Sequence, residues 1–215
     1  MIQVGALLGE GPDRVIEHSR GRRFVVFDDV LGQDAVILSG GPDSRWEDLE
    51  QQWSLIDPVV DGSARRRRVT NDLRRRSAEL DTIDDLVRAV VSSWGIAVPA
   101  DASLDFAFWR YGTGEGLSWH DDGADRIAAC TLYASRDWRA TWGGELELFD
   151  VPTDAVPMVA GDVASDLMGS PVNSTAIFPR FDRLVVLRAG TFHRVRPVTA
   201  FADGPRDSLT GFLQK

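Results

Sequence analysis

Hydrophobic and polar residues follow two different periods along the chain, and the period changes near residue 100. Before that point, two segments have apolar residues three and four positions apart, the spacing of an amphipathic helix. These segments are 45–56 and 82–94. The second has capping-box spacing at Thr82 and Asp85, and it is followed by Gly95, where a left-handed C-terminal cap belongs. We therefore expect two helices in the first half of the chain.

A short apolar run at 24–27 predicts a buried strand in the same half, and the Asp28-Asp29 pair after it is typical of a helix cap. From Ala102 onward apolar residues alternate with polar ones, and turn signals such as Gly143-Gly144 follow closely. The predicted strands are 106–111, 127–133, 145–149, 177–178, 184–187, 193–198 and 208–213.

Helices followed by many short strands predict an α+β protein whose second half is an antiparallel sandwich or barrel. The 215 residues contain no repeat and no low-complexity linker. We expect one domain over 1–215, with a mixed helical support at 1–100 and a β core at 101–215.

Composition narrows the classes of partner. With 24 basic and 33 acidic residues the net charge is −9, which argues against nucleic acid and membrane surfaces as partners. No apolar stretch approaches the ~18 residues of a membrane span, and Met1 to Leu8 lacks the basic flank of a signal peptide, so we expect a cytoplasmic protein. The single cysteine, Cys130, cannot form an internal disulfide, and its apolar surroundings predict a core residue.

Three histidines limit the chemistry that the chain can perform. His120 and Asp122 have the spacing that places both side chains on one face of a strand, and His193 follows 73 residues after His120. Two imidazoles and one carboxylate form the facial triad of non-haem Fe(II) oxygenases. On spacing alone a structural role for these histidines stays open, and His18, in a polar segment, is expected at the surface.

Sequence blocks around these residues occur in a fixed order. They are 111–122, 131–138, 143–146, 181–187, His193 with Val195 and Pro197, and 206–210. In this order they resemble the prolyl-4-hydroxylase-like branch of the 2-oxoglutarate and Fe(II)-dependent dioxygenases, over about 104–213.

The resemblance implies a double-stranded β-helix, the jelly roll of cupin-like proteins, with N-terminal helices packed on it. It also implies that Fe(II) is held by His120, Asp122 and His193, with dioxygen and 2-oxoglutarate as cosubstrates and ascorbate as a reductant. By its position, Arg206 matches the basic residue that binds the far carboxylate of 2-oxoglutarate in the family. An arginine suits this role, because a guanidinium can donate two parallel hydrogen bonds to a carboxylate. The other residues expected around the cosubstrate are Ser208, Thr210, Tyr111 and Tyr133.

Two details refine this expectation. The interval from His193 to Arg206 is thirteen residues, longer than in similar relatives, and the extra residues fall at 199–205, where a hairpin loop can hold them. Halogenating relatives have a small residue where this chain has Asp122, so halogenation is disfavoured.

The implied activity is oxidation of an unactivated C–H bond, with succinate and CO2 as coproducts. The only lysine is Lys215, so 23 of the 24 basic residues are arginine, which is typical of a GC-rich bacterial genome. We therefore expect a tailoring enzyme of bacterial secondary metabolism that acts on a small molecule, an amino acid or a peptide, free or tethered to a carrier. A protein prolyl hydroxylase and a non-catalytic metal-binding jelly-roll module are the alternatives. Hydroxylation is the default outcome, and desaturation, cyclisation, epimerisation and the oligomeric state stay open.

The only basic cluster has seven arginines within 65–76. Its like charges repel one another, which is typical of a solvated loop. The alternative interpretation is a mobile lid that meets an anionic substrate.

Overall fold

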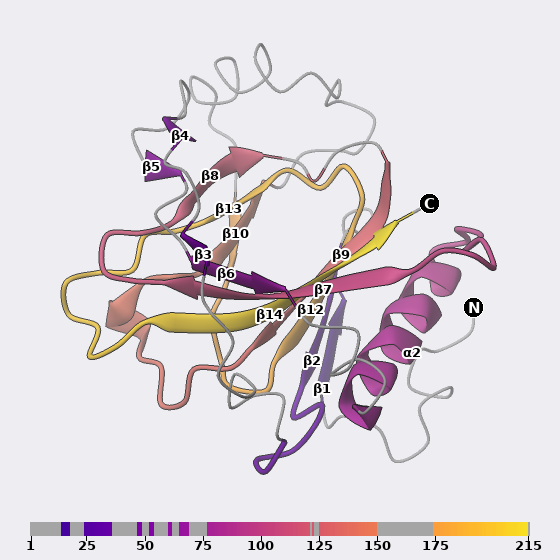
Figure 1. Ribbon diagram of the computed structural model, residues 1–215, viewed down its shortest axis with the longest axis horizontal. Coiled ribbons are helices and arrows are strands. Elements are labelled where there is room, and N and C mark those ends of the chain that lie inside the picture. The colour runs from indigo at the N-terminus through magenta and orange to yellow at the C-terminus, as the bar shows by residue number, and fades with distance from the viewer. Residues whose placement is uncertain are drawn as a thin grey trace.

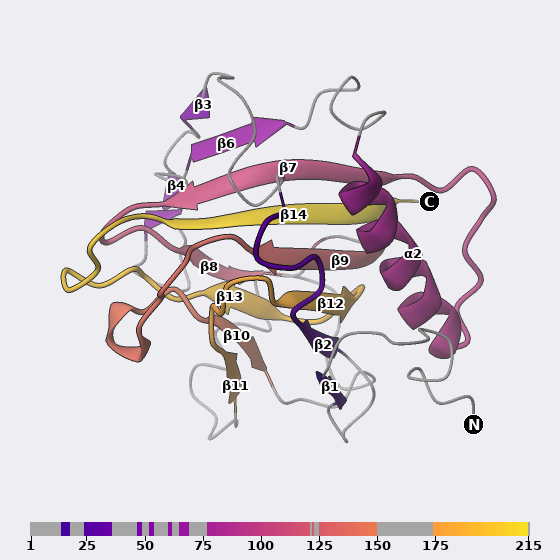
Figure 2. The same cartoon turned by 90° about the horizontal axis from the view of Figure 1, so that it is seen from below.

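Two antiparallel β-sheets face each other, and a helix covers the outer face of the larger sheet (Figures 1 and 2). The computed structural model describes residues 14–17, 24–35, 47–48, 52–53, 60–61, 65–68, 77–120, 122, 125–149 and 174–214. Strands of both sheets contribute to the apolar cluster between them, which includes Val26, Tyr133, Leu148 and Val185. This two-layer arrangement confirms the predicted jelly roll.

Among the described residues, eight strands form the larger sheet. Their order is β1 (Arg14–Glu17), β2 (Phe24–Asp28), β12 (Leu184–Arg188), β9 (Arg126–Tyr133), β14 (Arg206–Gln214), β7 (Leu104–Tyr111), β6 (Arg65–Arg68) and β3 (Glu47–Asp48). The smaller sheet has the order β11 (Ser174–Ile177), β10 (Leu146–Phe149), β13 (His193–Val195) and β8 (Leu117–His120). A separate two-stranded ladder pairs β4 (Gln52–Trp53) with β5 (Val60–Asp61), and a 3-10 helix spans Ala140–Trp142. The predicted strands of the second half are therefore confirmed, with shifted ends.

Helix α2 (Ala78–Ser93) lies where the second helix was predicted but begins four residues earlier. Its N-cap is Ser77, whose Oγ accepts a hydrogen bond from the Leu80 amide at 3.3 Å. Thr82 is not a cap, because its hydroxyl donates to the Ala78 carbonyl within the first turn. Gly95 follows the helix with φ +75°, as predicted for a left-handed cap.

The apolar stripe of α2 is buried against the outer face of the larger sheet. Leu209 and Leu213 of β14 face the helix, whereas Arg206, Ser208 and Thr210 point to the opposite side of the strand and line a cavity. The period-two pattern of β14 therefore separates the core from the cavity.

The helix predicted at 45–56 is wrong wherever the structure describes it. Residues 47–48 and 52–53 are strands, and the rest of the segment lies outside the described residues. A spacing of three and four positions in a segment with two tryptophans is only weak evidence for a helix. Pairing of Glu47–Asp48 with β6 decides the structure there instead. Within the described part of the chain, α2 is the only α-helix, so the N-terminal helices are not supported as a group.

Two further expectations need correction. The Asp28 carboxylate caps no helix: it ends β2, is buried, and accepts hydrogen bonds from Arg183 at 2.6 Å and from Arg180 at 3.0 Å. Residues 65–68 are neither a loop nor a lid, because they form β6 and pair with β7 over four positions. The register places Glu47 and Asp48 of β3 opposite Arg66 and Arg65.

Residues 69–76 of the arginine-rich segment and His18 lie outside the described residues. No helix in the described ranges has the length and apolar character needed to cross a membrane.

Candidate metal centre

The smaller sheet brings the two histidines together. Strands β8 and β13 are antiparallel neighbours, and His193 lies directly opposite His120 in their register, with the ring centroids 4.3 Å apart. Asp122 lies two residues beyond the end of β8, outside the strand, and its carboxylate lies close to both histidines. Asp122 Oδ1 lies 3.8 Å from His120 Nε2, and its Oδ2 lies 3.8 Å from His193 Nε2.

This geometry suits a metal ion. One ligand atom from each of the three residues lies within 4.8 Å of the other two. The Nδ1 of His193 is 2.8 Å from the Thr191 carbonyl oxygen, which can only accept, so Nδ1 carries the proton. The Nε2 lone pair is therefore free for a metal, the arrangement in which a backbone carbonyl orients a histidine ligand. The donor set of two imidazoles and one carboxylate fits Fe(II).

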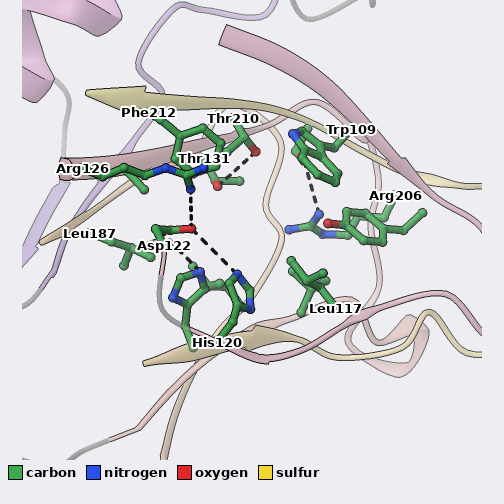
Figure 3. Close-up of a pocket in the computed structure, with 16 residues that line it drawn as sticks. Trp109, Leu117, His120, Asp122, Arg126, Thr131, Leu187, Arg206, Thr210 and Phe212 are labelled. Atoms are coloured by element: carbon green, nitrogen blue, oxygen red, sulfur yellow. Dashed lines mark hydrogen bonds and ion pairs between the residues drawn. The ribbon is translucent and has the colours of Figure 1, made fainter. Parts of the chain in front are cut away.

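The triad lies in the wall of a cavity of about 330 Å³ between the two sheets (Figure 3). Asp122 lines it together with residues of strands β7, β8, β9, β10, β12, β13 and β14, which are Trp109, Tyr111, Leu117, His120, Arg126, Ala129, Thr131, Leu146, Leu187, His193, Val195, Arg206, Ser208, Thr210 and Phe212. Only 9% of the His193 side chain and 11% of the Asp122 side chain are exposed, against 29% for His120.

Arg206 supplies a buried positive charge on the side of the cavity away from Asp122 (Figure 3). Its guanidinium carbon lies 4.8 Å from the centroid of the Tyr133 ring and 5.2 Å from that of Tyr111. Its Nη1 donates to Ser208 Oγ at 3.3 Å, while its Nε has no hydrogen-bond partner among the described residues. A buried donor without a partner needs an acceptor, and a bound carboxylate would provide one.

The Tyr133 hydroxyl is a second buried group without a hydrogen-bond partner in the described structure. Burial raises the pKa of the phenol, although the positive charge of Arg206 acts in the opposite direction. The phenol therefore stays protonated and can donate at neutral pH.

Most of the predicted cosubstrate residues share this cavity: Tyr111, Arg206, Ser208 and Thr210 line it. Tyr133 is not among the residues that line it, because its ring belongs to the apolar cluster between the sheets and packs against the Arg206 guanidinium. Cys130 is buried on the opposite face of β9, and burial raises its thiol pKa to about 12, as a core residue requires.

Several cavity residues were not predicted from the sequence. Trp109 and Phe212 lie two positions from Tyr111 and Thr210 on the same strands, so strict period-two counting could have found them. Arg126 was missed as well. Its Nη1 donates to Asp122 Oδ1 at 3.1 Å, and no motif distinguishes it from the other arginines in the sequence.

Comparison with known proteins identifies the class. The family model described as the 2OG-Fe(II) oxygenase superfamily matches residues 106–214, half of the chain. The chain belongs to this superfamily, whose enzymes use Fe(II), 2-oxoglutarate and O2. No curated protein sequence matches the chain.

Solved structures show the same fold. A prolyl-4-hydroxylase from Pseudomonas putida is 20% identical, with a TM-score of 0.50 over 71% of this chain and 70% of its own. A Trichoplax adhaerens prolyl hydroxylase, solved with a hypoxia inducible factor peptide fragment, is 16% identical, with a TM-score of 0.57 over 91% and 84%. HygX from Streptomyces hygroscopicus, solved with nickel and 2-oxoglutarate bound, is 14% identical, with a TM-score of 0.59 over 89% and 83%.

Proposed function

We propose that this oxygenase hydroxylates, or otherwise oxidises, an unactivated C–H bond of a small molecule, an amino acid or a peptide in bacterial secondary metabolism. In this proposal His120, Asp122 and His193 hold Fe(II), and Arg206 holds 2-oxoglutarate. One observation carries it: the three metal donors and a buried arginine with an unpartnered Nε line the same cavity. A protein that only stores a metal has no use for this arginine.

Bound iron and 2-oxoglutarate together supply the activation of dioxygen that C–H oxidation needs, with succinate and CO2 as coproducts. The protein supplies binding and orientation. The Arg206 guanidinium packs against the rings of Tyr111 and Tyr133, so it is already oriented before the far carboxylate of 2-oxoglutarate binds. Ser208 Oγ accepts from Arg206, which leaves its own proton for a carboxylate oxygen. Tyr111 and Thr210 line the same cavity, and the Tyr133 hydroxyl is the remaining donor.

Asp122 also bears on the type of oxidation. Its carboxylate reaches both imidazoles, so it fills the position that halogenating relatives leave open for chloride. Hydroxylation and related oxidations are therefore the proposed outcomes.

The proposal treats residues 1–215 as one domain. Its support is that β1, β2, β3 and β6, all from the first hundred residues, are strands of the same sheet as β7, β9, β12 and β14.

The test is succinate release from 2-oxoglutarate in air, with Fe(II) and ascorbate present and with each of a set of amino acids, small metabolites and proline-containing peptides added in turn. We expect succinate formation that depends on Fe(II), that at least one small compound stimulates, and that yields an oxidised product of that compound. His193→Ala is the matched control and should form no succinate. Stimulation by internal prolyl peptides alone would favour a protein prolyl hydroxylase, and no succinate from the wild type under any condition would contradict the proposal.

A further inference from the structure

A second arginine faces the cavity, on the side away from Arg206. Arg126 is the first residue of β9, and 27% of its side chain is exposed. Its Nη1 donates to Asp122 Oδ1 at 3.1 Å, and its guanidinium carbon lies 3.6 Å from the centroid of the Phe212 ring. The ion pair and the aromatic ring hold the guanidinium inside the cavity rather than in solvent.

Arg126 and Arg206 are separated by the length of a strand. In the β14–β9 register Arg126 lies opposite Gln214, eight residues beyond Arg206. At about 3.3 Å per residue, this separates the two backbone positions by about 26 Å. Figure 3 shows Arg126 together with Asp122 on one side of the cavity and Arg206 on the other. A five-carbon dianion whose far carboxylate is held by Arg206 therefore does not bring that carboxylate to Arg126.

The surroundings of Arg126 favour an anionic ligand. Within the described part of the chain, Asp122 is the only acceptor bonded to this guanidinium, through one of its five N–H groups. When Asp122 ligates a cation, its negative charge is shared between that cation and Arg126. The guanidinium then retains positive charge in a cavity whose walls nearby are the apolar side chains of Leu187 and Phe212. Positive charge at a partly dry site is best neutralised by an anion.

We propose, on the basis of the function proposed above, that Arg126 binds a free carboxylate of the compound that is oxidised. The planar fork matches a carboxylate, and the residue touches a metal ligand, so the bound carboxylate lies close to the oxidised carbon. The cavity of about 330 Å³ must also hold 2-oxoglutarate, which limits the size of the second ligand. The substrate class is therefore an amino acid or the C-terminal residue of a short peptide. An internal residue of a protein has no backbone carboxylate to offer.

The test is calorimetric titration of protein loaded with Ni(II) and 2-oxoglutarate. The probes are the twenty standard L-amino acids, glycyl dipeptides ending in each of them, and the carboxamide of every compound. The variants are Arg126→Gln and Arg126→Lys. Arg88→Gln is the matched control, since Arg88 also pairs with an aspartate four residues away at 3.1 Å, but on α2 outside the cavity.

We expect the wild type to bind at least one acid tenfold or more tightly than its carboxamide. Arg126→Gln should weaken binding of that acid by about 10- to 100-fold and leave its carboxamide unchanged, because a hydrogen bond between charged groups is lost. Arg126→Lys should give an intermediate affinity, and Arg88→Gln should bind as the wild type does.

Three results would overturn the proposal for Arg126 without contradicting the proposed function. The first is that no probe binds the loaded wild type, and the second is that acids and carboxamides bind equally. The third is that Arg126→Gln weakens Ni(II) binding but keeps the preference for acids. The third result would make Arg126 a positioning residue for Asp122. A wild type that binds neither Ni(II) nor 2-oxoglutarate in the loading step would instead contradict the proposed function, and the proposal for Arg126 would fall with it.

Discussion

Removing the Arg206 side chain should weaken 2-oxoglutarate binding far more than removing any surface arginine. Only 1% of Arg206 is exposed, so its pairing with a carboxylate is not screened by solvent. Truncating one partner of such a buried charge pair costs about 2–5 kcal/mol, which is about 30-fold to several-thousand-fold in Kd. We expect Arg206→Ala to weaken binding by at least about 30-fold, and Arg206→Lys to be intermediate because a lysine keeps the charge but loses the fork.

Titration calorimetry of 2-oxoglutarate into Ni(II)-loaded protein measures this effect. The matched control is Arg110→Gln. Arg110 lies beside Tyr111 on β7 and pairs with Asp207 of β14, with 35% of its side chain exposed, so it is close in the fold but outside the cavity. The control should bind 2-oxoglutarate normally. A Kd for Arg206→Ala within threefold of the wild type, in a protein that still binds Ni(II), would refute the assignment of Arg206 to the cosubstrate.

Two further predictions concern the packing around the site. A Cβ at Gly144 would lie 2.8 Å from Arg206 Cδ, so Gly144→Ala should displace the guanidinium and weaken 2-oxoglutarate binding. The control is Gly95→Ala, because Gly95 has a similar φ near +75° but no atom within 4 Å of the added Cβ. This control should lower the stability of the protein and leave 2-oxoglutarate binding unchanged. Equal affinity of the two glycine variants for 2-oxoglutarate, measured by calorimetry, would contradict the steric argument. Burial raises the pKa of the Cys130 thiol to about 12, so little thiolate is present in the folded protein at about pH 8. The native thiol should therefore react with an aromatic disulfide at least 100-fold more slowly than the thiol of the urea-unfolded protein. Rapid labelling of the folded protein would contradict the place of Cys130 in the core.

The strands and their inner faces could be predicted from the sequence because each depends on a local pattern. In β14, alternation alone divides Arg206 and Ser208 from Leu209 and Leu213, and the structure places the first pair at the cavity and the second under the helix. The residues of the triad could be named because few histidines compete for the role.

What the sequence did not predict depends on contacts between distant segments. The segment at 45–56 has helical spacing, but pairing of 47–48 with β6 decides its structure. The arginines at 65–68 suggested a loop because their charges repel, and their pairing with β7 could not be read from local composition. Arg126 is chemically ordinary in the sequence and becomes notable only because its guanidinium, at the start of β9, pairs with Asp122 of the triad and lines the cavity.

The most direct test of the metal and cosubstrate site is anaerobic titration of Fe(II) and then 2-oxoglutarate into the protein, followed by visible absorption. A 2-oxo acid bound to ferrous iron gives a weak charge-transfer band, and we expect this band in the wild type. His193→Ala should lack it while keeping the circular dichroism of a folded protein, because two ligands hold a labile ion poorly. A wild type without the band, or a His193→Ala variant with the full band, would contradict the proposal that His120, Asp122 and His193 hold the iron.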